Sequence, residues 1–140
     1  MKLALSGRAK GIYLLMTGST NPQCSRIQHG TVSITYIDGS VAKLRLSNPE
    51  NWWPIEQDYL IDDYLFVNDA PLPARVDLRT GTTRVLDAAS FKGKGRTVPG
   101  GAATILHLPL DASKQLASLQ VNAELYGIVV GLLAATLVRG

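Results

Sequence analysis

The sequence predicts an all-β fold of short antiparallel strands with little or no helix. Apolar and polar residues alternate over stretches bounded by Gly, Pro, Asn and Asp, which is the period of strands with one buried face. No stretch keeps a 3.6-residue apolar period for ten residues, and residues 110–119 come nearest. With 140 residues, of which 46% are hydrophobic and 18% charged, the chain predicts one globular domain spanning 1–140. Two antiparallel sheets packed face to face are the expected arrangement.

The first half of the chain gives the clearest strands. Leu3 and Leu5 alternate with Lys2 and Ala4 and predict a short edge strand. Residues 11–17 are apolar at most odd and even positions alike, so both faces of the strand are apolar, which predicts a central strand. After a loop rich in Gly, Ser and Asn, residues 31–46 predict a β-hairpin, because two alternating stretches flank Asp38-Gly39, a dipeptide suited to a primed turn.

The second half predicts a second hairpin and three longer strands. The hairpin joins residues 74–78 to residues 83–86. Residues 102–110 and 116–125 follow as strands. The last stretch, 128–138, is β-branched and apolar, so we expect it to be central in its sheet.

Residues 48–66, here called the aromatic loop, hold both tryptophans and a cluster of carboxylates. Pro49 and Pro54 each fix φ and lack a backbone donor, so the segment cannot be a central strand or a helix interior. A sugar ring stacks on aromatic faces, and its hydroxyls pair with carboxylates. The candidate carbohydrate-binding residues are therefore Trp52, Trp53, Glu56, Asp58, Tyr59, Asp62, Asp63 and Tyr64. The alternative is a loop that closes the end of the sandwich with its aromatics; adjacent Trp52 and Trp53 point to opposite sides if extended, so one is expected in the core.

The carboxylates also permit two other interpretations. Asp58, Asp62, Asp63, Asn68 and Asp69 offer oxygen ligands for a structural calcium, but the segment lacks the Gly of a tight calcium loop. Paired carboxylates could act as the acid and base of a glycosidase, with Glu56 or Asp58 as the candidates. Neither pattern is complete, and we expect no catalytic residue, no bound metal and no cofactor.

Other residue types exclude several function classes. The basic loop with Lys92, Lys94 and Arg96 lacks an aromatic platform, so no nucleic-acid partner is expected. The longest apolar run, 128–138, is too short to cross a bilayer. Cys24 is alone, which excludes an internal disulfide. Arg75 and Arg79 beside Asp77 predict ion pairing at the surface.

The order of these elements resembles a known family. The segments IYLLMTGST, VSITYIDGSVAKLRL, NPENWW and VVGLLAATL are similar to the galactose-binding-like β-sandwich domains appended to bacterial glycan-degrading proteins. The resemblance implies a jelly roll that is often non-catalytic and binds carbohydrate or a structural calcium. It also implies an extracellular or periplasmic location, beside a catalytic domain of a longer parent. The first hypothesis is thus a non-catalytic domain that targets a glycan-active protein to polysaccharide. The second is a structural or interaction domain that packs on a neighbouring domain or on a second copy of itself.

Overall fold

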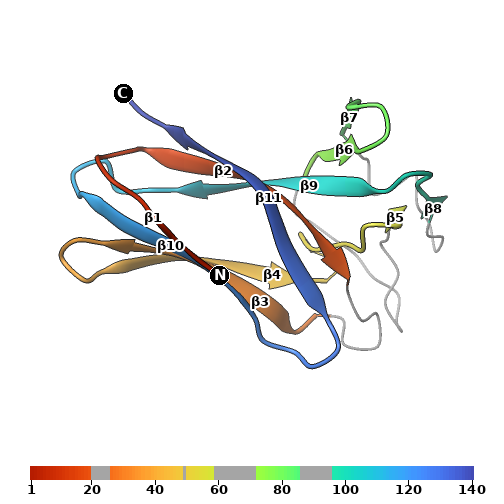
Figure 1. The fold of residues 1–140 in the computed structure, drawn as a ribbon, viewed down its shortest axis with the longest axis horizontal. Helices are drawn as coiled ribbons and strands as arrows, with labels where there is room; N and C mark the ends of the chain where they lie inside the picture. Colours follow the sequence, from red (N-terminus) through yellow and green to blue (C-terminus); the bar gives the residue numbers. More distant parts are fainter. Residues whose placement is uncertain (20–25, 49, 59–71, 86–95) are drawn as a thin grey trace.

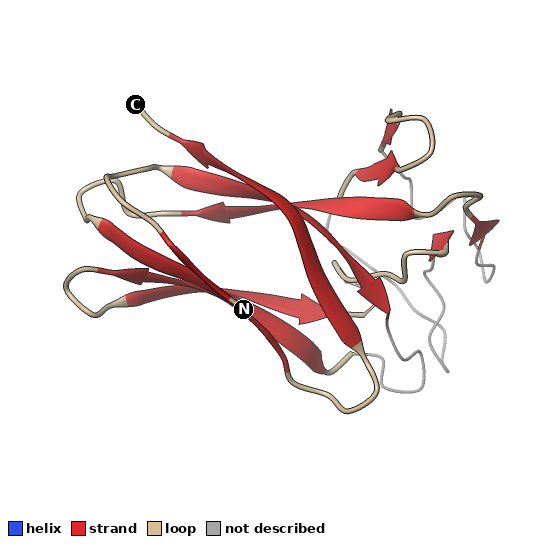
Figure 2. Cartoon of the chain, in the orientation of Figure 1, coloured by secondary structure: helices blue, strands red, loops and turns tan. Residues whose placement is uncertain are grey.

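The computed structural model describes residues 1–19, 26–48, 50–58, 72–85 and 96–140. It confirms an all-β fold, with no helix in those ranges and two antiparallel sheets forming a sandwich (Figure 2). Within the same ranges there is no helix long and apolar enough to cross a membrane. The predictions for Cys24, Lys92 and Lys94, and those for most of the carboxylate cluster, fall outside the described residues.

The strands follow one another along the chain as the hairpin spacing predicts. They are β1 (Lys2–Ala4), β2 (Gly11–Ser19), β3 (Gln28–Tyr36), β4 (Val41–Ser47), β5 (Gln57–Asp58), β6 (Arg75–Asp77), β7 (Thr83–Arg84), β8 (Arg96–Thr97), β9 (Ala102–Pro109), β10 (Leu116–Ala123) and β11 (Val129–Val138). One sheet has four strands in the order β1-β10-β3-β4, and the other has five in the order β11-β2-β9-β6-β7 (Figure 1). The short strands β5 and β8 pair with each other at the end where the aromatic loop lies.

The core lies between the two sheets and is built from alternate residues of each strand. From the five-stranded sheet, Ile12, Leu14 and Met16 on β2 are fully buried. Val32 and Ile34 on β3 are equally buried in the four-stranded sheet. The same core cluster also contains Ala9, Tyr36, Leu46, Trp52, Leu106, Leu108, Leu116, Leu119 and Val121.

Both predicted hairpins are confirmed. In the first, β3 pairs with β4 so that Val32 opposes Leu44, and Gly39 at the tip has a φ of 86°. That left-handed backbone conformation is easy only for glycine, which explains the Asp-Gly dipeptide. In the second, β6 pairs with β7, and Arg75 opposes Arg84.

The prediction that residues 128–138 form a central strand is wrong. β11 is the outer strand of the five-stranded sheet and pairs only with β2 among the described strands. Its side chains are largely exposed in its second half, Leu133–Thr136. An apolar, uncharged sequence is compatible with a central strand, but it does not by itself bring a second neighbour to the strand.

Candidate functional site

Trp52 and Trp53 are both fully buried, with 0% of each side chain exposed. The indole of Trp52 belongs to the main core cluster. The indole of Trp53 lies under the guanidinium of Arg75, whose Cζ is 5.4 Å from the ring centroid. The two rings therefore differ in their surroundings, and neither is available to stack on a sugar. The expectation of a solvent-facing indole is wrong.

Backbone hydrogen bonds fix the described part of the aromatic loop to the neighbouring strands β2 and β9. Ile55 N donates to the carbonyl of Gly18 over 2.9 Å, and the carbonyl of Ile55 accepts from Ala102 N over 2.8 Å. Asn48 donates from Nδ2 to the carbonyl of Trp52 over 2.9 Å. The described part of the loop, 50–58, thus closes one end of the sandwich, as its alternative interpretation predicts.

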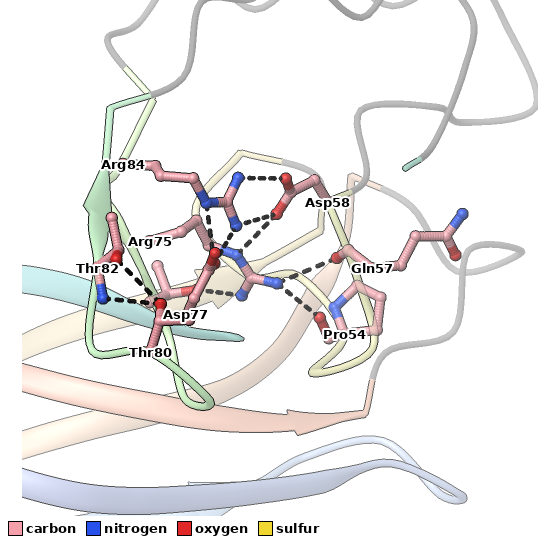
Figure 3. Close-up of polar contacts among 9 residues, drawn as sticks. Pro54, Gln57, Asp58, Arg75, Asp77, Thr80, Thr82 and Arg84 are labelled. Carbon is pink, nitrogen blue, oxygen red and sulfur yellow. Dashed lines mark hydrogen bonds and ion pairs between the residues drawn. The ribbon is translucent and has the colours of Figure 1, made fainter. Parts of the chain in front are cut away.

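A buried arginine joins the aromatic loop to the five-stranded sheet (Figure 3). Arg75 on β6 is 0% exposed and donates from Nη1 to Thr104 Oγ1 over 2.8 Å. Its Nη2 donates to the carbonyls of Pro54 and Gln57 over 2.9 and 3.1 Å. Its Nε donates to Asp58 Oδ1 over 3.3 Å. The guanidinium is therefore hydrogen-bonded through all three of its nitrogens.

A second arginine completes a network of two cations and two carboxylates. Arg84 on β7 donates from Nη1 to Asp58 Oδ2 over 2.7 Å. Its Nη2 donates to Asp77 Oδ1 over 2.5 Å, and the side chains of Arg84 and Asp77 remain 23% and 24% exposed. The network of Asp58, Arg75, Asp77 and Arg84 is electrically neutral. A buried ion pair of this kind needs such complete pairing, because desolvation of each charge is costly.

The pKa of each buried group follows from this pairing. Burial raises the pKa of the Asp58 carboxyl, but the hydrogen bond and charge of Arg84, together with those of Arg75, outweigh burial and hold it below its usual value. Burial lowers the pKa of the Arg75 guanidinium despite the neighbouring charge of Asp58. Hydrogen bonds to Asp58 and Asp77 raise the pKa of Arg84. The shifts of Asp58 and Arg84 both favour the charged forms of these two groups.

The other predicted site residues do not gather around an open site in the described part of the chain. Glu56 is exposed, while its backbone carbonyl accepts from Val98 N over 2.9 Å. Tyr59, Asp62, Asp63 and Tyr64 lie outside the described residues. Asp58 is the only described residue of the calcium candidates, and both of its oxygens are bound by arginine. The described residues contain no group of His, Cys, Asp and Glu that could hold a metal ion.

The local sequence around Arg75 and Arg84 does not predict this buried network. Arg75 was expected at the surface with Arg79, whereas Arg75 is buried and only Arg79 is exposed. Arg75 pairs with Thr104 in the register of β6 and β9, and Thr104 faces the sandwich interior beside Met16. A charged residue in a three-residue strand carries no local sign of that inward direction.

The outer surfaces of the two sheets differ in chemistry. On the five-stranded sheet, Tyr13, Leu15, Ile105 and Ala134 lie on the side away from the core, and we call them the outer apolar face. In the strand registers Tyr13 opposes His107, and Leu15 lies between Ile105 and Ala134. Tyr13 is 47% exposed, and Ala134 is also exposed. Strands with one solvated face normally carry polar residues there, so this face departs from the usual pattern.

The outer surface of the four-stranded sheet is polar and hollowed. A groove of about 450 Å³ lies over β3, β4 and β10, and its lining residues are Gln28, Thr31, Ser33, Lys43, Arg45, Asn122 and Glu124. Gln28 donates from Nε2 to Glu124 Oε2 over 2.5 Å, and Thr31 Oγ1 donates to Glu124 Oε1. Within the described residues, neither Lys43 nor Arg45 forms an ion pair.

Comparison of the chain with protein-family models, curated proteins and solved structures finds no match.

Proposed function

We propose that this β-sandwich is a non-catalytic interaction domain that packs its outer apolar face against another protein surface. The proposal rests on the alternation of side chains along β2, which places Tyr13 and Leu15 on the solvent side of the sheet. Contiguous exposed apolar side chains commonly mark protein contact sites. Burial of a side chain of this size contributes about 1.5–3 kcal/mol, so several together can hold a partner.

The closed end of the sandwich supports the same conclusion. A loop that binds sugar by stacking needs an indole at the surface, and both indoles are inside. Asp58, one of the four carboxylates expected to bind hydroxyls, is held by two arginines. The described part of the aromatic loop therefore belongs to the core, and the outer apolar face is a surface available for recognition in the described part of the chain.

The partner that fits this face is a folded protein surface of aliphatic and aromatic groups, such as a neighbouring catalytic domain of a longer parent. Hydrophobic-interaction chromatography at low protein concentration tests the accessibility of the face. We expect Tyr13→Lys to elute earlier than the wild type, because the change places a charge in the middle of the face. Thr35→Lys is the matched control, since it adds the same charge to the outer side of β3. Identical elution of Tyr13→Lys and the wild type would contradict the proposal.

A second candidate function, carbohydrate binding, is supported by the polar groove. Hydroxyls of Thr31 and Ser33 lie between the cations of β4 and the amide of Asn122, because Thr31 opposes both Arg45 and Asn122. Hydroxyl and amide groups suit sugar hydroxyls, and Lys43 and Arg45 suit a carboxylate. The groove would then serve an accessory domain of the galactose-binding-like, jelly-roll kind, bound to an acidic polysaccharide.

Affinity electrophoresis tests this second function. We expect polygalacturonate to retard the protein and a neutral galactan to retard it less. Lys43→Gln and Arg45→Gln should each weaken retardation, whereas Arg8→Gln, a change at an exposed cation outside the groove, should not. Equal retardation of all three variants by polygalacturonate would contradict a specific site.

A further inference from the structure

The four outer strands of the two main sheets differ in how well they resist pairing with another chain. β1 has three residues and includes Lys2, and β7 has two residues and includes Arg84. β4 has seven residues and includes Lys43 and Arg45. Short strands and charged side chains are the usual devices that prevent edge-to-edge association. β11 lacks both devices, because it is ten residues long and includes no charged residue.

The free part of β11 is its second half. A β-bulge interrupts the pairing with β2 between Leu132 and Ala134, and Leu133 is 51% exposed at the bulge. After the bulge, Ala134, Ala135 and Thr136 pair with β2 on one side and remain exposed. Their small side chains allow another backbone to approach closely, and no described strand lies on their other side.

We propose that β11 pairs antiparallel with β11 of a second copy of this chain, through the segment Leu133–Val138. This inference goes beyond the proposed function, because it concerns the edge of the sheet and not the outer apolar face. Antiparallel pairing of a strand with itself is a two-fold contact, in which each residue meets the same segment of the other copy. The equivalent contact through β4 would bring Lys43 and Arg45 of both copies together, whereas β11 has no like charges to oppose.

Self-pairing also extends the outer apolar face. Ala134 lies beside Leu15 and Thr136 beside Tyr13, so the paired strands would join two apolar faces in one continuous surface. The assembly closes at two copies, because β11 is the one such edge among the described strands and the opposite edge of the same sheet is the two-residue strand β7. The structure therefore predicts a dimer and not a fibre.

Sedimentation velocity over a range of concentrations, together with hydrogen–deuterium exchange, tests this pairing on the full chain. We expect a reversible monomer–dimer equilibrium, with amide exchange of residues 133–138 slowing as the dimer forms. Ala134→Lys and Thr136→Lys should each weaken dimerisation by about tenfold or more, since each brings two like charges close together across the two-fold contact. Val41→Lys is the matched control on the edge of the other sheet, and it should leave the equilibrium unchanged.

The possible failures are distinguishable. A dimer without slowed exchange in residues 133–138 would overturn edge pairing and leave the outer apolar face as the contact. A chain that stays monomeric, with fast exchange in β11, would overturn self-pairing, whereas chromatography of Tyr13→Lys decides separately whether the apolar face is accessible. Circular dichroism of each Lys variant shows whether it is folded, and a dimer that persists in folded Ala134→Lys and Thr136→Lys would also overturn the inference.

Discussion

Arg75 and Asp58 form an ion pair of 3.3 Å from which solvent is excluded on both sides. Arg75 comes from the second hairpin, and Asp58 comes from the end of the described part of the aromatic loop. The guanidinium also covers the indole of Trp53. The pair thus joins the loop, the hairpin and the core at one end of the sandwich, and several predictions about stability depend on it.

Replacement of Arg75 by Leu should destabilise the protein by about 3–5 kcal/mol, because it removes one of the two arginines that pair with the buried Asp58 in the described part of the chain. It also removes the donors to the carbonyls of Pro54 and Gln57. Urea unfolding measures the change. Arg79→Leu, at an exposed position of the same hairpin, should change stability by less than about 0.5 kcal/mol and is the control.

The double variant Arg75→Leu/Asp58→Leu should be more stable than Arg75→Leu alone. Removal of both charges eliminates the uncompensated carboxylate, and buried pairs replaced by apolar residues often lose little stability. Comparison of the single and double variants by urea unfolding gives the coupling free energy between Arg75 and Asp58. If the second change lowered stability further, the carboxylate would not be the source of the cost.

Acid should destabilise the wild type partly through Asp58. Its pKa is lower in the folded state than in the unfolded state, so the folded state binds fewer protons. The corresponding stability is fully present above the unfolded pKa, about 4, and is lost as the pH falls through the folded pKa. In Asp58→Asn the unfolding free energy should therefore vary less with pH below about 4. Equal slopes for the variant and the wild type would show that Asp58 titrates alike in both states.

The elements that the sequence predicts well are those whose signal is local. Alternation across β3 and β4 and the Asp38-Gly39 turn both lie within one hairpin, and the hairpin forms as expected. The Arg75–Asp58 pair is different, since 17 positions separate its members. Its existence depends on how the hairpin docks on the loop, which no local pattern encodes.

The wrong predictions concern what lies beside a segment in the fold and not the secondary structure of the segment itself. β11 is a strand as predicted, but its apolar sequence fits an uncovered edge as well as a covered centre. Trp52 and Trp53 point into different surroundings as their adjacency predicts, yet both surroundings are buried, because Arg75 covers the second ring. In each case the missing information is a long-range contact.

Trp52→Ala and Trp53→Ala should each destabilise the fold by about 3–5 kcal/mol, as truncation of large buried aromatics does. Tyr126→Ala is the control, since its side chain is 104% exposed. The intrinsic fluorescence of the wild type should be blue-shifted and resistant to iodide, because both indoles are enclosed. A red-shifted, readily quenched emission would contradict the burial of at least one ring.

Gly18 and Gly131 lie near each other in the pairing of β2 with β11 and should respond oppositely to alanine. At Gly18, where φ is 154°, a Cβ would lie 1.9 Å from the carbonyl oxygen of Val129 and 3.0 Å from Cζ2 of Trp52. Gly18→Ala should therefore cost about 1–3 kcal/mol or more, through strain and displacement of a backbone group.

At Gly131 the nearest atom, the carbonyl oxygen of Thr17, is 3.4 Å away, which is an acceptable contact. Gly131→Ala should stabilise by about 0.4–1 kcal/mol, because it restricts the unfolded chain without straining the native one. Thermal unfolding measures both changes. Because Val129 begins β11, a tolerated alanine at position 18 would mean that the start of this strand lies further from β2 than the structure places it.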